Sequence, residues 1–343
     1  MKLWFTKGVW TRRNAAKKIG KLSYADIKSI AILRHAALGD MVLTRSFIIE
    51  ARKLFPNAKI TLSVVSNYTR GIPEDLVDRV HIIHGTDQRD TPLRKRIKKI
   101  RELGHNDFIF DLAAGNRSFL TCLLNPAILK FGFPYRILRA WMFYDVALGR
   151  SDLNFEVNDM LNMLLVLGAK TDYPHVYDMQ GTAMQRDKPY IVYFIGASAP
   201  EKCWSRERFT ELIKQMSLEY PDTDHLILDG LKEWEKADTI LSNIEKKPNI
   251  GAITADTIDE TISVLKGARL LISNDTGIRH IAITSNIPTV GIFLGGPYRY
   301  WPRYPIHEAV FPGDKESAIE VSDVKNACDR LLSKLGDQIA KRT

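Results

Sequence analysis

Short apolar runs that end in turn residues alternate with longer amphipathic stretches along most of this chain. The predicted strands are residues 28–33, 58–65, 80–84, 107–112 and 127–132, and then 190–195, 225–229, 249–253, 269–273 and 289–293. The predicted helices are residues 40–54, 92–103, 116–124, 206–219, 232–242, 257–266 and 277–285, and a further helical stretch lies near 152–168. Such alternation indicates parallel sheets with helices on both faces. Because the series occurs twice, we predict two doubly wound α/β domains.

The points where the alternation stops set the predicted boundaries. The divisions are a basic leader (1–27), an N-terminal domain (28–169), a polar linker (170–189), a C-terminal domain (190–320) and a C-terminal helix (321–343). A length of 343 residues accommodates two domains of about 150 residues each. In sheets of this type, ligands bind beyond the carboxyl ends of the strands, so polar residues at those ends are the candidates for a site.

Composition excludes several other classes of protein. No stretch approaches the roughly 18 unbroken apolar residues of a membrane-spanning helix, and the N-terminus lacks the apolar core of a signal peptide. The three cysteines, Cys122, Cys203 and Cys328, are too widely spaced for a CxxC metal clip and too few for a disulfide framework. We therefore expect a reducing, cytoplasmic setting.

The positive charge is concentrated in the leader. The chain has 49 Lys and Arg against 40 Asp and Glu, a formal net charge of +9. Residues 1–27 hold seven of these cations and one acid, together with the apolar side chains Leu3, Trp4, Phe5, Val9 and Trp10. Two interpretations stay open: these residues bind an anionic membrane surface, or they form a helix whose aromatic side chains pack on the N-terminal domain.

A second basic cluster occupies residues 94–101. Leu93, Ile97 and Ile100 recur at helical spacing among its cations. The pattern predicts a helix with one buried stripe and a basic outer face. Such a face attracts phosphates, although it is equally compatible with a merely solvated surface.

Three loops that follow predicted strands carry unusual polar residues. The first runs from His35 to Asp40, where Gly39 permits a tight turn and Asp40 opens the helix. Asp40 is either a helix N-cap or a general base at the ligand edge of the sheet. The second loop runs from Gly196 to Trp204, in which Ser198 could donate a hydrogen bond to a phosphate and Lys202 could neutralise it.

The third loop leads from Ser273 into a helix that contains His280. Backbone N–H groups at the start of this helix form an anion site suited to a diphosphate. Asp275 and Thr276 could instead be caps, and His280 a buried structural histidine.

Motifs of several other chemistries are missing or misplaced. No Walker A sequence, no GxGxxG after a strand and no GxSxG is present. The Asp222-Thr223-Asp224 sequence has the DxD form of a metal site, but it precedes the strand at 225–229 and so lies opposite the ligand edge. We interpret it as a turn and expect no metal site and no cofactor.

Taken together, the three loops resemble the ADP-heptose:lipopolysaccharide heptosyltransferases, glycosyltransferase family 9. The matching stretches are Ile32–Thr44, Leu54–Ile60, Gly196–Ser198, Lys202–Ser205, Ile272–Ala282 and Pro288–Phe293. The resemblance implies a GT-B architecture, in which two Rossmann-like domains face each other across a cleft. The N-terminal domain would bind the acceptor, and the C-terminal domain would bind the nucleotide-sugar.

The resemblance also assigns roles to residues of this sequence. Asp40 falls on the family's proposed base and Lys202 on its phosphate-binding lysine. The remaining donor-site residues are Ser198, Glu233 (or else Glu235), Asp275, Thr276, Gly277 and His280. Apart from the resemblance, Gly39, Arg117 and Arg136 are candidate acceptor contacts, because Arg117 and Arg136 follow predicted strands of the N-terminal domain. Where the best-known members have two adjacent threonines, this chain has Ala197 and Ser198.

The implied reaction is a metal-independent, inverting transfer of heptose from ADP-heptose to a lipid-linked anionic saccharide of the lipopolysaccharide core. It would place the protein in the cytoplasm, or peripherally on the inner face of the inner membrane of a Gram-negative bacterium. The alternatives are a transferase or epimerase that uses another nucleotide-sugar, and a non-catalytic protein that binds a sugar or polyanion. A nucleic-acid partner is not expected, because aromatic residues do not interleave with the basic clusters.

Overall fold

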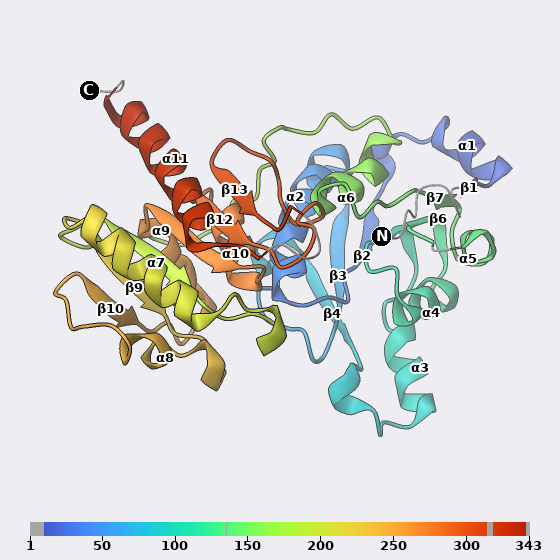
Figure 1. The fold of residues 1–343 in the computed structure, drawn as a ribbon. Helices are drawn as coiled ribbons and strands as arrows, with labels where there is room; N and C mark the ends of the chain where they lie inside the picture. The colour runs from blue at the N-terminus through green and yellow to red at the C-terminus, as the bar shows by residue number, and fades with distance from the viewer. Residues whose placement is uncertain (1–9, 135, 314–317, 341–343) are drawn as a thin grey trace. The chain divides into compact units, whose positions relative to one another are not determined.

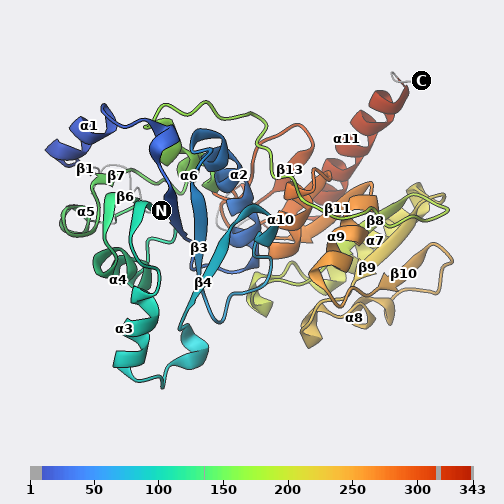
Figure 2. The same cartoon turned by 180° about the vertical axis from the view of Figure 1, so that it is seen from behind.

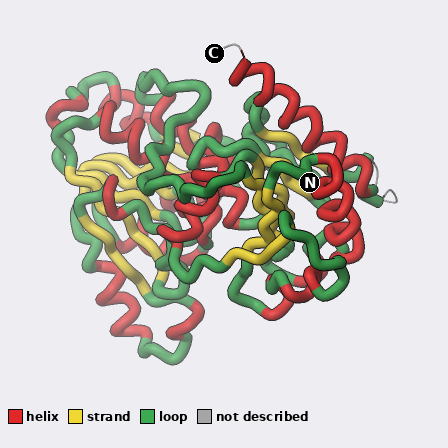
Figure 3. The backbone as a smooth tube through the Cα atoms, turned by 90° about the vertical axis from the view of Figure 1, so that its left-hand side faces the viewer, coloured by secondary structure: helices red, strands yellow, loops and turns green. Residues whose placement is uncertain are grey.

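The computed structural model describes residues 10–134, 136–313 and 318–340. The chain divides into two compact units, Met1–Tyr177 and Asp178–Thr343, which Figure 1 shows from blue to red along the sequence. Figure 3 shows the strands gathered into two groups, each with helices around it.

Unit 1 contains a seven-stranded sheet. Its strands are β1 (Trp10–Thr11), β2 (Ser29–Leu33), β3 (Lys59–Val65), β4 (Arg79–Ile83), β5 (Asn106–Asp111), β6 (Ala127–Gly132) and β7 (Val146–Ala147). Their order in the sheet is β1-β7-β6-β5-β2-β3-β4. Every pairing is parallel except that of β1 with β7. Apolar runs without polar alternation form the central strands because both faces of the sheet are covered.

Helices cover both faces of this sheet. They are α1 (Arg13–Ile19), α2 (Leu38–Leu54), α3 (Leu93–Arg101), α4 (Asn116–Leu124), α5 (Ile137–Phe143) and α6 (Glu156–Leu165). α2 and α6 pack together over one face, where Phe47 of α2 lies edge-on to Phe110 of β5. On the other face Phe119 of α4 and Ala140 of α5 pack with Leu33 and Ile109 of the sheet.

Residues 10–27 of the predicted leader are part of this packing. β1 adds an antiparallel edge strand to β7, and Trp10 packs against the cluster beneath α4 and α5. The Tyr24 hydroxyl donates to the Leu167 carbonyl at 2.6 Å. Leu3, Trp4, Phe5 and Val9, the other apolar side chains in the two interpretations of the leader, lie outside the described residues.

Unit 2 contains a six-stranded parallel sheet. Its strands are β8 (Tyr190–Phe194), β9 (Asp224–Leu228), β10 (Ile250–Ile253), β11 (Leu270–Asn274), β12 (Thr289–Ile292) and β13 (His307–Val310), in the order β10-β9-β8-β11-β12-β13. Its helices are α7 (Arg206–Glu219), α8 (Asp238–Leu241), α9 (Ile258–Gly267), α10 (Gly277–Thr284) and α11 (Val321–Ala340). α7 packs with α8 and α11, whereas α9 packs with α10, as can be followed in Figure 2.

The prediction of two doubly wound, Rossmann-like α/β units is confirmed, with three local corrections. The helix predicted over 232–242 is wrong: a single 3-10 turn (Glu233–Glu235) and α8 take its place, because the Asp229 carboxylate accepts the Ala237 N–H at 2.8 Å and breaks the helix. Leu93 is 66% exposed rather than buried, since only the far end of α3, at Ile100, reaches the core. The short elements β1, β7, β13, α1 and α5 were not predicted.

No helix in the described ranges is long and apolar enough to cross a membrane.

Candidate functional site

Strand order defines one switch point in each unit, where the chain changes direction across the sheet. In unit 1 the chain runs from β2 to β3 and β4, then returns to place β5 on the other side of β2. In unit 2 it runs from β8 to β9 and β10, then returns to place β11 beside β8. Loops diverge at such points and leave room for a ligand beyond the carboxyl ends. The loop with Asp40 follows β2, and the loops with Lys202 and Asp275 follow β8 and β11.

Asp40 is the third residue of α2, not its N-cap. The helix begins at Leu38, two residues earlier than predicted, and its N-cap is Ala37. The alternative role of Asp40 as a cap is therefore wrong. Its Oδ1 atom instead accepts Arg34 Nη2 at 2.9 Å, and its side chain is 26% exposed. An oriented carboxylate with access to solvent thus lies at the switch point of unit 1.

Arg34 links Asp40 to a buried charge network. The guanidinium of Arg34 is 2% exposed and also donates to Glu156 Oε1 at 3.0 Å and to the Leu112 carbonyl at 2.8 Å. Glu156 is fully buried at the first position of α6, and it pairs in addition with Arg150. Two arginines and two carboxylates therefore hold the end of β2, the start of α2 and the start of α6 together.

His35 lies on a chain of hydrogen bonds that fixes its tautomer. His81 Nε2 lies 2.8 Å from the Lys99 carbonyl, so it must donate, and burial lowers the pKa of His81 and keeps it neutral. Ser63 therefore donates to His81 Nδ1 at 3.0 Å and accepts from His35 Nε2 at 3.4 Å. This leaves His35 Nδ1 as an acceptor.

The environment of His35 keeps the ring neutral. Burial, with help from the positive charge of Arg117, lowers the pKa of His35 to about 3. His35 Nδ1 and Arg117 Nε are both buried and make no hydrogen bond within the described residues. His35, after β2, thus offers a free hydrogen-bond acceptor atom, and Arg117, after β5, offers a free hydrogen-bond donor atom. β2 and β5 are the two strands of the switch point.

The residues predicted to contact the acceptor saccharide also lie at the carboxyl-end edge of this sheet. Gly39 is the second residue of α2, and Arg117 is the second residue of α4, directly after the loop that follows β5. Arg136 is the exposed N-cap of α5, after β6. Gly39 and Arg117 therefore lie at the switch point, whereas Arg136 lies one strand further along the sheet.

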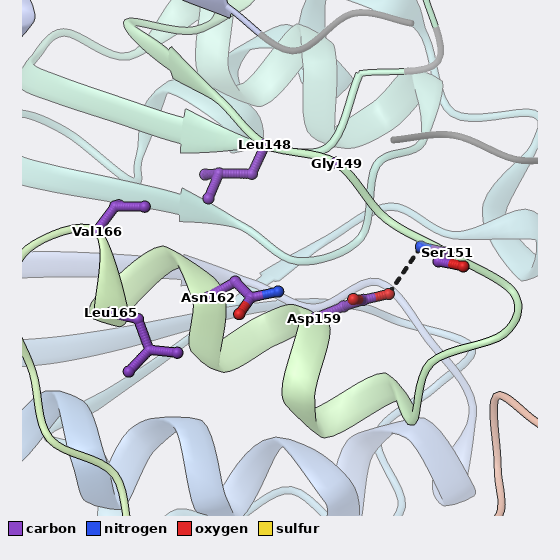
Figure 4. Close-up of a pocket in the computed structure, with 7 residues that line it drawn as sticks. All are labelled: Leu148, Gly149, Ser151, Asp159, Asn162, Leu165 and Val166. Carbon is purple, nitrogen blue, oxygen red and sulfur yellow. Dashed lines mark hydrogen bonds between the residues drawn. The ribbon is translucent and has the colours of Figure 1, made fainter. Parts of the chain in front are cut away.

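A pocket of about 500 Å³ lies beside α6, near the Glu156 network. Figure 4 shows Leu148, Leu165 and Val166 around the pocket. Asp159 and Asn162 of α6 also line it. Asp159 accepts the Ser151 N–H at 2.9 Å and the Asn154 amide at 2.7 Å. Burial nevertheless dominates and raises the pKa of Asp159 to about 6.

We expect the Asp159→Asn variant to gain stability over the wild type as pH rises. The folded protein holds the Asp159 proton more tightly than the unfolded chain, so ionisation between about pH 4 and 6 destabilises the fold. The stability difference between variant and wild type should be about 2 kcal/mol larger at pH 7.5 than at pH 4.5. Urea unfolding at both pH values measures it. The exposed Asp90→Asn serves as the matched control, and equal pH trends in both variants would contradict the assignment.

In unit 2 a buried amide joins the two predicted donor loops. Asn274 ends β11, and its side chain accepts the Trp204 N–H at 2.9 Å and donates to the Ile195 carbonyl at 2.7 Å. The residue is fully buried. The loops after β8 and β11 are therefore held side by side at the switch point.

Lys202 and Ser198 lie on the solvent side of the loop after β8. Lys202 ends a 3-10 turn (Pro200–Lys202), and both side chains are exposed. A second cation joins them, because Lys232 Nζ donates to the Ser198 carbonyl at 3.0 Å while lying 4.7 Å from the Trp234 ring. Sequence reasoning missed Lys232, although its place after β9 was a usable signal.

The loop after β11 presents the N-terminus of α10. Thr276 is the N-cap, yet its side chain makes no capping hydrogen bond, and Gly277 is the first helical residue. Asp275 is oriented by Arg279 Nη2 at 3.0 Å, with His280 Nε2 at 4.0 Å from the same oxygen. His280 is 5% exposed and packs edge-on to Tyr300. All four predicted residues thus meet around one helix start.

Glu233 and Glu235 differ sharply in their surroundings. Glu233 is exposed, whereas Glu235 is 8% exposed and accepts the Lys232 N–H at 3.1 Å. Glu235 also packs so closely on Gly196 and Gly230 that a Cβ atom at either glycine would lie within 2.5 Å of it. Glu235 therefore has a packing role, and Glu233 keeps its carboxylate toward solvent.

Asp224 is the first residue of β9, so the Asp222–Asp224 segment lies at the amino end of that strand, as predicted. Arg186 pairs with Asp224 at 2.8 Å. Within the part of the chain that the structure describes, no group of three or more His, Cys, Asp or Glu residues is arranged to hold a metal ion.

Comparison with known proteins identifies the family. The family model described as glycosyltransferase family 9 (heptosyltransferase) matches residues 97–325, about two thirds of the chain. Lipopolysaccharide heptosyltransferase 1 of Campylobacter coli is 24% identical over 335 residues, which cover 87% of this chain and 94% of that protein.

Solved structures share the fold. A glycosyl transferase family 9 protein from Veillonella parvula matches with a TM-score of 0.74 at 19% identity, covering 92% of this chain and 99% of that one. E. coli heptosyltransferase WaaC with ADP-2-deoxy-2-fluoro heptose matches with a TM-score of 0.69 at 18% identity, covering 89% and 99%. The predicted fold class, two Rossmann-like α/β units as in the GT-B glycosyltransferases, is thereby confirmed. This chain belongs to glycosyltransferase family 9, the heptosyltransferase family.

Proposed function

We propose that this protein transfers heptose from ADP-heptose to an anionic saccharide of the lipopolysaccharide core, with inversion at the anomeric carbon and without a metal ion. The observation that carries the proposal is the position of its residues. Asp40 lies at the switch point of one unit, and Lys202 with the Asp275–His280 loop lies at the switch point of the other. The names of the similar heptosyltransferases supply the sugar and the acceptor class.

In this mechanism unit 1 prepares the acceptor. The Asp40 carboxylate, oriented by Arg34, takes the proton from the attacking hydroxyl. His35 Nδ1 and Arg117 Nε offer an acceptor and a donor to other groups of the saccharide. Arg117 and Arg136 supply positive charge for its phosphates or carboxylates.

Unit 2 holds the donor and stabilises the leaving group. As the bond from the anomeric carbon to the diphosphate breaks, negative charge develops on the departing oxygen. Lys202, the Ser198 hydroxyl and the N–H groups at the start of α10 stabilise that charge. Glu233 contacts the ribose or the base, and Asp275 with His280 contacts the sugar-diphosphate.

The test is a donor screen on the purified protein. ADP-heptose and a heptose-deficient lipopolysaccharide acceptor should give a product one heptose heavier by mass spectrometry, with inverted anomeric configuration by NMR. Activity should persist in a chelator. Transfer from a different nucleotide-sugar, retention of configuration, or loss of activity that a divalent ion restores would each overturn the corresponding part of the proposal.

We expect Lys202→Ala to weaken ADP binding roughly 10- to 100-fold, because hydrogen bonds to charged groups contribute about 1.5–3 kcal/mol each. Isothermal titration calorimetry with ADP measures this effect. Lys246→Ala, which removes an exposed lysine of the same unit, is the control and should bind ADP like the wild type. Equal affinity in the two variants would remove Lys202 from the diphosphate site.

A further inference from the structure

Helix α5 exposes four large apolar side chains within six residues. Ile137, Leu138, Trp141 and Met142 are 57%, 62%, 60% and 45% exposed, and we call these four residues the α5 patch. No other element of the described ranges exposes four large apolar side chains. The opposite side of the helix is anchored, because Ala140 is buried in the cluster that includes Phe119 and Tyr144. A patch of this kind on a stably packed helix marks an interaction surface.

Basic residues surround the patch. Arg12 Nη2 donates to the Trp141 carbonyl at 2.7 Å and so fixes the start of α1 beside α5. Residues 10–27 and 136–145 together contain seven Lys and Arg residues and two acids, Asp26 and Asp145, and Asp145 pairs with Arg12 at 3.5 Å. Arg13 and Lys17 of α1 and Arg136 of α5 are exposed. Figure 1 shows α1 and α5 close together at one end of unit 1. This end therefore carries both the α5 patch and the exposed cations of α1.

An apolar patch beside exposed cations favours one kind of binding partner over another. A second copy of the chain would bring the same cations against each other in a two-fold contact, which like charges disfavour. An anionic bilayer instead satisfies both features: lipid phosphates attract the cations, and the headgroup region accepts Trp and aliphatic side chains. We propose that the α5 patch, with the cations of α1, docks this protein on an anionic lipid surface.

The proposal differs from the prediction for the leader. There the apolar anchors were side chains near the N-terminus, whereas here they belong to residues 137–142. α1 contributes charge, and β1 with Trp10 is committed to the sheet and its packing. Docking is a property of this surface and does not depend on which sugar the enzyme transfers.

Vesicle cosedimentation of the full chain tests the proposal. Wild type should bind vesicles of phosphatidylethanolamine with phosphatidylglycerol and bind phosphatidylcholine vesicles poorly. The Leu138→Ser/Trp141→Ser double variant should lose roughly 100-fold in partition coefficient, from the two large apolar groups removed. Arg13→Glu/Lys17→Glu should lose roughly 30-fold or more in partition coefficient, on anionic vesicles only. Leu218→Ser, which changes a residue 71% exposed on α7, is the matched control and should bind like the wild type.

Two further readouts keep the result decisive. Trp141→Phe keeps an aromatic, apolar side chain at this exposed position, and it should remove most of the blue shift in tryptophan emission that anionic vesicles cause in the wild type. The double variant should still glycosylate a lipid-free saccharide acceptor, so a failure of docking is distinguishable from a failure of the proposed function. Wild-type vesicle binding in the double variant, loss of binding only on deletion of residues 1–9, or a dimer that the double variant dissociates would each overturn the proposal.

Discussion

Replacing Asp40 with asparagine should lower turnover by about two to four orders of magnitude, the usual contribution of a positioned general base. Asparagine has nearly the same shape, and its oxygen can still accept the Arg34 Nη2 hydrogen bond. It cannot take up the proton of the attacking hydroxyl. Because Asp40 lies in unit 1 and the donor residues lie in unit 2, ADP affinity should change little. Steady-state kinetics and ADP titration of the same preparation separate the two effects.

The control must exclude a general loss of structure. Asp90→Asn makes the same chemical change on an exposed residue of the same unit, and it should leave both turnover and thermal stability unaltered. A second check is Asp40→Glu, which keeps the carboxylate but displaces it, and which should retain more activity than Asp40→Asn. Near-wild-type turnover in Asp40→Asn would show that Asp40 is not the general base of the reaction.

Sequence alone located the loops that carry these residues because the end of each buried strand is marked locally, by an apolar run that stops at turn residues. The predicted strand at 28–33 ends where β2 ends, and that position already places Asp40 at the ligand edge. The same reasoning placed Ser198, Lys202 and the Asp275–His280 loop after β8 and β11. Only the helix start at Leu38 was needed to decide against Asp40 as a cap.

Contacts between distant parts of the chain could not be predicted in the same way. Arg34 and Glu156 are 122 residues apart, and nothing in either local sequence indicates that they form a buried pair. Asn274 carries a signal for a turn, but its hydrogen bonds to Ile195 and Trp204 depend on the pairing of β8 with β11. Short edge strands such as β1 and β13 are formed by tertiary pairing, and their sequences are too brief for a pattern.

The buried network that positions Asp40 gives the second large effect. Glu156 is fully buried at the first turn of α6, where the helix N-terminus favours a carboxylate, and it faces both Arg34 and Arg150. Glu156→Ala would leave two buried guanidinium groups with a deficit of negative charge. Removing one partner of a buried ion pair costs about 3–5 kcal/mol. We therefore expect a loss of that size in the free energy of unfolding, measured by urea denaturation.

A surface pair provides the comparison that identifies burial as the cause. Glu102 pairs with Lys99 at 2.8 Å, with both side chains at least 40% exposed, so Glu102→Ala should cost no more than about 1 kcal/mol. Glu156→Gln should fall between the two, because it keeps a hydrogen-bond acceptor but not the charge. Its turnover should fall further than its stability alone explains, since Arg34 would be held less firmly against Asp40. If Glu156→Ala and Glu102→Ala lost equal stability, the network would be a packing feature and Arg34 would have to be positioned by Asp40 and the Leu112 carbonyl alone.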